Sequence, residues 1–151
     1  MYKFLTQVVV ISGETGCGKT TQVPQFILES FIEKGDGSLC NIIVTQPRQI
    51  SAISVAERVA EERNEVVGQT IGYSVRLDHR TPSRPSGTVL FCTTGILFQR
   101  LKSDPLLTRC SHVIVDEIHE RDVLSDFLIT VLKKLIEIRP NLKVTSAIRK
   151  Y

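Results

Sequence analysis

The stretch Gly13-Glu14-Thr15-Gly16-Cys17-Gly18-Lys19-Thr20 decides the fold of this 151-residue chain. It follows an apolar run over residues 8–11, which is typical of a buried strand, and it precedes a helical pattern over residues 20–31. Its glycines allow a tight backbone wrap that other residues resist. We therefore predict a strand, a glycine-rich loop and a helix, in that order.

The residues of this loop suit the binding of a phosphate chain. Their spacing is G-x-x-x-x-G-K-T, and inward-pointing backbone N–H groups, together with the N-terminal end of the next helix, would attract an anion. Lys19 would place a cation on the β and γ phosphates, and the Thr20 hydroxyl would ligate Mg²⁺. The predicted nucleotide site comprises Gly13, Glu14, Thr15, Gly16, Cys17, Gly18, Lys19, Thr20 and Thr21. The alternative is a glycine-rich turn that binds nothing, and the flanking strand and helix favour the phosphate loop.

Composition indicates one soluble domain of ordinary size. The net charge of +3 at pH 7 allows an anionic partner but does not require one. The four cysteines show no C-x-x-C spacing, which argues against a zinc site and fits a reducing compartment, the cytoplasm or the nucleus. The apolar run over residues 4–11 ends directly in the glycine-rich loop, so we predict a first buried strand rather than a signal peptide. No stretch is long enough for a membrane span.

Apolar runs rich in β-branched residues alternate with helical patterns along the whole chain. This alternation predicts an α/β fold with a mostly parallel sheet and helices on both faces. In such sheets ligands bind at the carboxyl ends of the strands. We expect strands over residues 7–12, 41–45, 71–76, 89–92, 112–115 and 141–148, helices over 20–31, 49–63, 94–102 and 121–138, and a loop over 80–87.

A second chemical motif follows the apolar run over residues 113–115. Asp116 and Glu117 stand at the carboxyl end of that predicted strand. Beside a phosphate loop, Asp116 would orient hydrated Mg²⁺, and Glu117 would accept a proton from the attacking water and could contact the metal. His119 would sense the γ-phosphate or a facing domain, the alternative being an ordinary surface histidine.

Four ordered stretches together resemble a known family. They are GETGCGKTTQVPQF (13–26), TQPRQISAISVAERVAEER (45–63), TTGILFQRL (93–101) and DEIHER (116–121), and they look like the first RecA-like domain of DEAH-box RNA helicases. The D-E-I-H spelling and the IGYSVR stretch (71–76) resemble the branch that includes RNA helicase A and the G-quadruplex-resolving helicase.

The resemblance implies a fold, cofactors and partners. It implies a single RecA-like P-loop NTPase domain over residues 1–151 that uses ATP and Mg²⁺ and belongs to an enzyme moving 3′→5′ on single-stranded RNA. It implies catalytic roles for Lys19, Asp116, Glu117 and His119, and contact with the purine for Arg58. The nucleic-acid side would comprise Gln46, Pro47, Arg48, Thr93, Thr94 and Gly95.

The chain departs from the family pattern in three places. Gln49 stands where a second arginine is usual, so one phosphate contact would be lost. The third motif reads Ser146-Ala147-Ile148 on a strand that looks shortened, which puts the coupling of hydrolysis to strand separation in doubt. The 151 residues also hold no second RecA-like domain, which we expect in cis in a full-length protein.

Two other functions remain open at this point. A truncated binding module would keep the fold and bind RNA or a protein without hydrolysing ATP. An unrelated P-loop ATPase would leave the TQPR and TTG stretches unexplained. Without its facing domain, we expect the isolated chain not to be a competent helicase.

Overall fold

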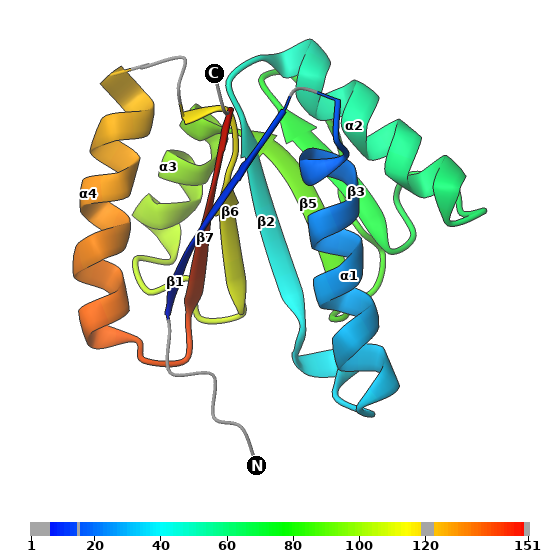
Figure 1. Ribbon diagram of the computed structural model, residues 1–151, viewed down its shortest axis with the longest axis horizontal. Coiled ribbons are helices and arrows are strands. Elements are labelled where there is room, and N and C mark those ends of the chain that lie inside the picture. Colours follow the sequence, from blue (N-terminus) through cyan, green and yellow to red (C-terminus); the bar gives the residue numbers. More distant parts are fainter. Residues whose placement is uncertain (1–6, 15, 119–122, 150–151) are drawn as a thin grey trace.

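The computed structural model describes residues 7–14, 16–118 and 123–149, and these form a seven-stranded sheet between two layers of helices (Figure 1). The strand order is β1-β7-β6-β2-β5-β3-β4. Every neighbouring pair is parallel except β3 and β4, which are antiparallel. The strands are β1 (Val8–Gly13), β2 (Asn41–Gln46), β3 (Ile71–Val75), β4 (Asp78–Arg80), β5 (Thr88–Thr93), β6 (His112–Val115) and β7 (Lys143–Arg149). The predicted α/β architecture is confirmed.

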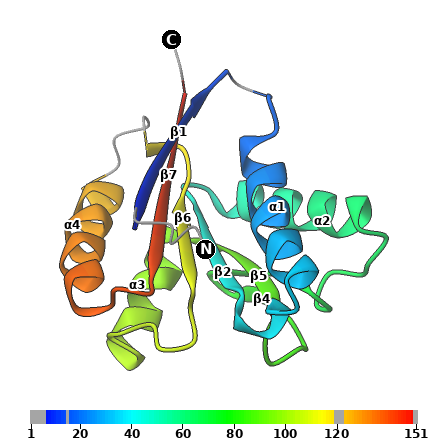
Figure 2. The same cartoon turned by 60° about the horizontal axis from the view of Figure 1, so that its bottom comes forward.

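The helices cover the two faces of the sheet in pairs, as Figures 1 and 2 show. One face carries α1 (Lys19–Glu33) and α2 (Gln49–Glu62), and the other carries α3 (Thr94–Ser103) and α4 (Val123–Ile138). A short 3₁₀ turn, η1 (Gly37–Leu39), follows α1. None of the described helices combines the length and apolar character needed to cross a lipid bilayer.

Two hydrophobic cores result, because the central strands are buried on both faces. Ile42 and Val44 of β2 pack in the core under α1 and α2, whereas Ile43 between them packs in the core under α3 and α4. Alternate residues of a strand point to opposite faces, so one strand serves both cores. This explains why β2 reads as a continuous apolar run rather than an alternating one.

The prediction that the first strand is buried is wrong. β1 lies at one edge of the sheet, paired with β7 on one side, and Val8, Val9 and Val10 are 46%, 45% and 60% exposed. No described element lies beyond β1 to cover these side chains. An apolar run predicts a strand, but whether that strand is central or at an edge depends on the order of the other strands.

The last strand falls largely within the predicted stretch. β7 runs over seven residues, Lys143–Arg149, against the expected range of 141–148. It lies between β1 and β6, with Ser146 in register with Val10 on one side and Val115 on the other. The third motif therefore stands between the strands that carry the first two. The side chain of Ile148 lies outside the described residues.

The sequence did not predict the hairpin formed by β3 and β4. Val75 pairs with Asp78 across a two-residue turn of Arg76 and Leu77, in which Leu77 has a φ of 68°. Gly72 permits this hairpin, because a Cβ there would lie only 2.4 Å from the carbonyl oxygen of Arg80. The side chains of β4 are exposed, so no apolar pattern marks it as a strand.

We predict that His112 makes the fold less stable in acid. Its ring packs edge-on against Phe31 with 5.4 Å between the ring centroids, and Nδ1 lies 2.9 Å from Ser111 Oγ. Burial, with a smaller contribution from the charge of Lys143, lowers the pKa of His112 to about 4. In the unfolded chain His112 takes up a proton near pH ~6.5, whereas in the folded chain it does so only near pH 4. Between these two values the unfolded state binds more protons, so the free energy of unfolding falls as the pH drops.

The test is urea denaturation of the wild type and His112→Gln at pH 7 and pH 4.5. The wild type should lose about 2 kcal/mol more than the variant over this range, a figure reduced for the partial exposure of the ring. Equal losses in the two proteins would contradict this assignment.

Candidate functional site

The predicted motifs gather at one edge of the sheet, where the parallel strands end. The glycine-rich loop follows β1, Asp116 follows β6, Pro47 and Arg48 follow β2, and Thr94 follows β5. The loop and the carboxylate pair thus lie at one end of this edge, separated only by β7. The stretches assigned to nucleic acid lie further along the same edge, after β2 and β5.

The glycine-rich loop wraps as its sequence predicts. Gly16 and Gly18 have φ values of 79° and 83°, a region that residues with a side chain rarely adopt. Lys19, the first residue of α1, donates from Nζ to the carbonyl oxygens of Gly13 at 2.7 Å and Glu14 at 2.6 Å. Its ammonium group therefore lies across the mouth of the loop, where phosphate oxygens could replace these carbonyls. Thr15 lies outside the described residues.

Asp116 is the point where the loop and the second motif meet. Its carboxylate is buried, and Oδ2 accepts hydrogen bonds from the hydroxyl of Thr20 and, at 2.8 Å, from Nε2 of Gln46. Oδ1 accepts the backbone N–H of Glu117 at 2.9 Å. The structure thus brings Thr20 and Asp116 together, although 96 residues separate them in the chain.

The structure places Gln46 differently from the other residues assigned to nucleic acid. Its side chain is 3% exposed and points to Asp116. No local sequence pattern indicates this contact, because it depends on β2 and β6 being neighbours in the sheet. Gln46 therefore belongs to the carboxylate site, and the next residue, Pro47, is the first of its stretch to face outward.

The residues around Asp116 fit a magnesium ion. Hydroxyl and carboxylate oxygens are hard ligands of the kind Mg²⁺ prefers, and Mg²⁺ is usually held by one or two carboxylates together with phosphates and water. No cluster of three or more His, Cys, Asp or Glu side chains suited to a metal occurs in the described part of the chain. Thr20 and Asp116 would offer two oxygen ligands, and phosphate oxygens and water would complete the shell.

Glu117 has an unusual backbone. Its φ of 56° lies in the left-handed region, which is strained for a residue with a side chain and is common at functional sites. This conformation turns the chain sharply where β6 ends. His119, the other predicted residue of this motif, lies outside the described residues.

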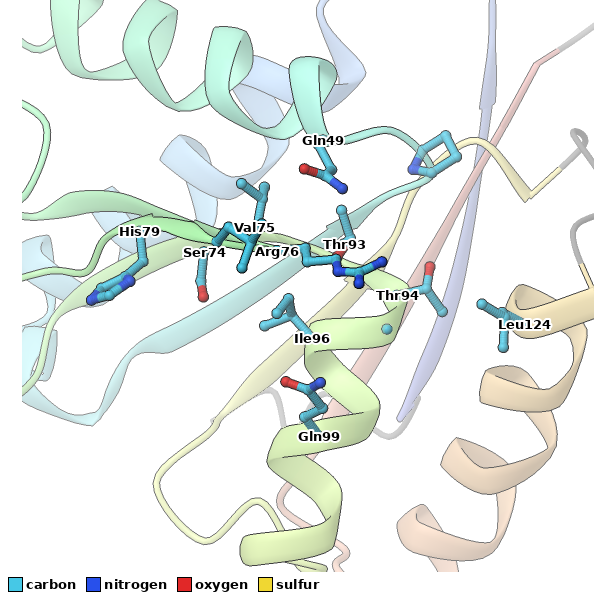
Figure 3. A pocket seen from close by; sticks show the side chains of 13 residues that line it. Gln49, Ser74, Val75, Arg76, His79, Thr93, Thr94, Ile96, Gln99 and Leu124 are labelled. Carbon is cyan, nitrogen blue, oxygen red and sulfur yellow. The ribbon is translucent and has the colours of Figure 1, made fainter.

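A cavity of about 690 Å³ lies further along the same edge (Figure 3). Of the residues assigned to nucleic acid, Pro47, Thr93, Thr94 and Gly95 line it, whereas Arg48 is exposed beside it at the start of α2. The complete lining is Pro47, Gln49, Ser74, Val75, Arg76, Leu77, His79, Thr93, Thr94, Gly95, Ile96, Gln99 and Leu124.

Sequence reasoning missed the polar side chains that the hairpin adds to this cavity. Ser74, Arg76 and His79 come from β3, the turn and β4, and the side chain of Arg76 reaches toward Thr93 and Thr94 in Figure 3. Gln49, which stands where an arginine is usual, lines the same cavity. Arg76 therefore supplies a cation where Gln49 does not. Gly72 in β3 was the available sequence signal for a tight hairpin.

Arg58 lies on an exposed part of α2. Its side chain is 65% exposed, and Nε donates to Glu62 Oε1 at 2.8 Å. The hydrogen bond to Glu62 raises the pKa of the Arg58 guanidinium further, so the group stays charged.

Comparison with known proteins agrees with this arrangement. The family described as DEAD/DEAH box helicase matches residues 2–147. The chain is 61% identical over 140 residues to the human ATP-dependent DNA/RNA helicase DHX36, which covers 91% of this chain and 14% of that protein. It is 54% identical over 137 residues to the human ATP-dependent RNA helicase DHX30, with 91% and 11% covered, and 55% identical over 138 residues to DExH1 of Arabidopsis thaliana, with 91% and 14% covered. The chain thus spans 14% or less of the length of these relatives. The match along nearly the whole chain shows that it is a RecA-like domain belonging to the DEAD/DEAH box helicase family.

Proposed function

We propose that this chain binds Mg-ATP and single-stranded RNA as the first of two RecA-like halves of a 3′→5′ RNA helicase. The observation that carries the proposal is the end of β2. Gln46 contacts Asp116 in the carboxylate site, and the adjacent Pro47 lines the cavity, so one strand end touches both sites. A motor that couples a nucleotide to a nucleic acid needs such a connection.

The chemistry at the first site follows from its side chains. Lys19 would hold the β and γ phosphates, and Thr20 and Asp116 would hold the metal. Bound Mg²⁺ would supply positive charge against the phosphate oxygens. Glu117 would orient the attacking water and accept its proton, and His119 would contact the γ-phosphate or the facing domain.

The cavity suits the backbone of a nucleic acid. The helices α2 and α3 both begin beside it, and neither has a side-chain cap on its first N–H groups. These helix starts, the hydroxyls of Thr93 and Thr94 and the charge of Arg76 favour phosphate oxygens without reading the bases. Binding there would be independent of sequence and sensitive to salt.

Other groups would come from the rest of a longer protein. In related NTPases, cations that reach the γ-phosphate from a facing partner increase the rate by about 10³–10⁵. A second RecA-like domain in cis would add these cations to the charge of Lys19. We therefore expect nucleotide binding by this chain with little hydrolysis and no strand separation.

We predict that Lys19→Ala abolishes the binding of Mg-ATP, because the loop loses the cation that faces the phosphates. The measurement is fluorescence titration with a labelled ATP analogue, with and without EDTA. The control is Lys102→Ala, which removes the same charge from an exposed position near the end of α3. Unchanged affinity in Lys19→Ala would refute the phosphate site, and duplex unwinding by the 151 residues alone would refute the need for a second domain.

We predict that Arg76→Ala weakens the binding of a single-stranded oligouridine about tenfold. It should also reduce the slope of log K against log salt concentration by about one, the contribution of one phosphate contact. Fluorescence anisotropy between 50 and 200 mM salt measures both quantities. The control is Arg84→Ala, an equal loss of charge at an exposed residue that lines a different cavity. Equal effects of the two variants would mean that only net charge matters. The same titration with single-stranded DNA tests whether the cavity prefers RNA.

A further inference from the structure

A groove of about 980 Å³ lies between α1 and the part of the sheet formed by β1 and β7. Its floor consists of alternate residues of these two neighbouring strands, Val9 and Ile11 of β1 and Lys143 and Thr145 of β7. Alternate residues of a strand share a face, so these side chains lie on one side of the sheet. Among the described helices, only α1 and α2 lie on this side (Figure 1), and they pack chiefly on β2, β3 and β5. The described helices therefore leave this face of β1 and β7 largely uncovered.

The wall of the groove is one face of α1. Its lining residues recur every three or four positions, which is the spacing of side chains on one face of a helix. Such a stripe extends over about three turns, or ~17 Å. The lining residues of α1 and its C-cap are Val23, Phe26, Ile27, Ser30, Phe31 and Lys34.

Exposed apolar side chains gather in this groove. Phe26 of α1 is 63% exposed, Leu39 of η1 is 64% exposed and Val9 of β1 is 45% exposed, and all three line it. Single exposed apolar residues are ordinary, but apolar residues that share one concave surface mark a place where another chain binds.

The shape of the groove favours a helix as its occupant. Helices normally cover both faces of a parallel sheet, and neighbouring helices pack about 8–10 Å apart. A floor of strand side chains beside a wall of helix side chains is the space that a helix next to α1 would fill. A strand would instead pair with the backbone at the edge of β1 and leave the floor and the wall uncovered.

The cations of the groove lie at one end. Lys34 caps the end of α1, Arg109 comes shortly before β6 and Lys143 begins β7, so all three lie near the amino ends of the strands. None of the described residues that line the groove is acidic. A helix with carboxylates at one end would therefore complement it. A nucleic acid, which is charged along its whole length, would not match the apolar floor.

We propose that this groove binds an amphipathic helix of a partner protein, with an apolar stripe of about three turns and carboxylates at one end. The groove includes none of the residues assigned to the nucleotide or to the nucleic acid. Lys19→Ala should therefore bind such a helix as the wild type does.

The experiment uses a yeast-displayed library of helices of about 18 residues, long enough to cover the stripe, in which one face and both ends vary. The fluorescently labelled 151-residue chain sorts this library. Selected helices should carry apolar residues at i, i+3, i+4 and i+7 and Asp or Glu at one end. A selected helix, made as a free peptide, is then titrated by fluorescence anisotropy.

Two variants test the groove itself. Phe26→Ser should weaken the selected peptide about tenfold, because it removes a large apolar contact, and its exposure means that the fold should tolerate the change. Lys34→Ala should weaken it about threefold at low salt and less at high salt. The matched controls are Phe127→Ser, a phenylalanine 59% exposed on α4, and Lys102→Ala on α3, both on the opposite face of the sheet. Both should bind as the wild type does.

Three results would overturn the proposal. The first is a sort in which the wild type enriches no helix beyond those that Phe26→Ser enriches. The second is selected helices without carboxylates, or equal binding by Lys34→Ala and the wild type, which would remove the charged end. The third is sedimentation that shows the wild type self-associating and Phe26→Ser monomeric, since a second copy of this chain would then fill the groove.

Discussion

The buried carboxylate of Asp116 is the contact on which both sites depend. A carboxylate removed from water needs donors around it, and here they come from Thr20 at the start of α1, from Gln46 at the end of β2 and from the next backbone N–H. These residues are far apart in the chain. They meet because parallel strands β1, β6 and β2 end at one edge of the sheet. The hydrogen bonds to Asp116 therefore depend on this strand order.

The same arrangement connects the two ends of that edge. A metal or phosphate bound at Asp116 would compete with Gln46 for the same oxygen, and Gln46 is followed at once by Pro47 in the cavity wall. Ser146 lies beside Val115, the residue before Asp116. Three motifs that the sequence separates are therefore in reach of one carboxylate. Such proximity would connect the proposed nucleotide site to the proposed nucleic-acid site.

Local patterns predicted much of this fold, and the failures have physical reasons. Glycine spacing and apolar periodicity located the loop, the α/β architecture and the carboxylate pair, because these depend on neighbouring residues. The exposure of β1 and the contact of Gln46 depend on which strands are neighbours, and no local pattern shows that. The hairpin that carries Arg76 was not predicted, because β4 is short and its side chains are exposed. The sequence of β4 therefore shows no alternation of apolar and polar residues. Thr15 and His119 lie outside the described residues and stay predictions.

The position of β1 has a consequence for the order of folding during synthesis. The described pairing partner of β1 is β7, which begins at Lys143. β1 is synthesised early but can pair only after β7 has been synthesised. The segment from β2 to β6 can pair within itself beforehand, since β2 joins β5 and β6 directly. Such long-range closure is slow, and unpaired apolar strands are recognised by chaperones. The strand that carries the glycine-rich loop would therefore pair last, and in a ribosome-bound intermediate its backbone N–H and C=O groups would still lack their partners in β7.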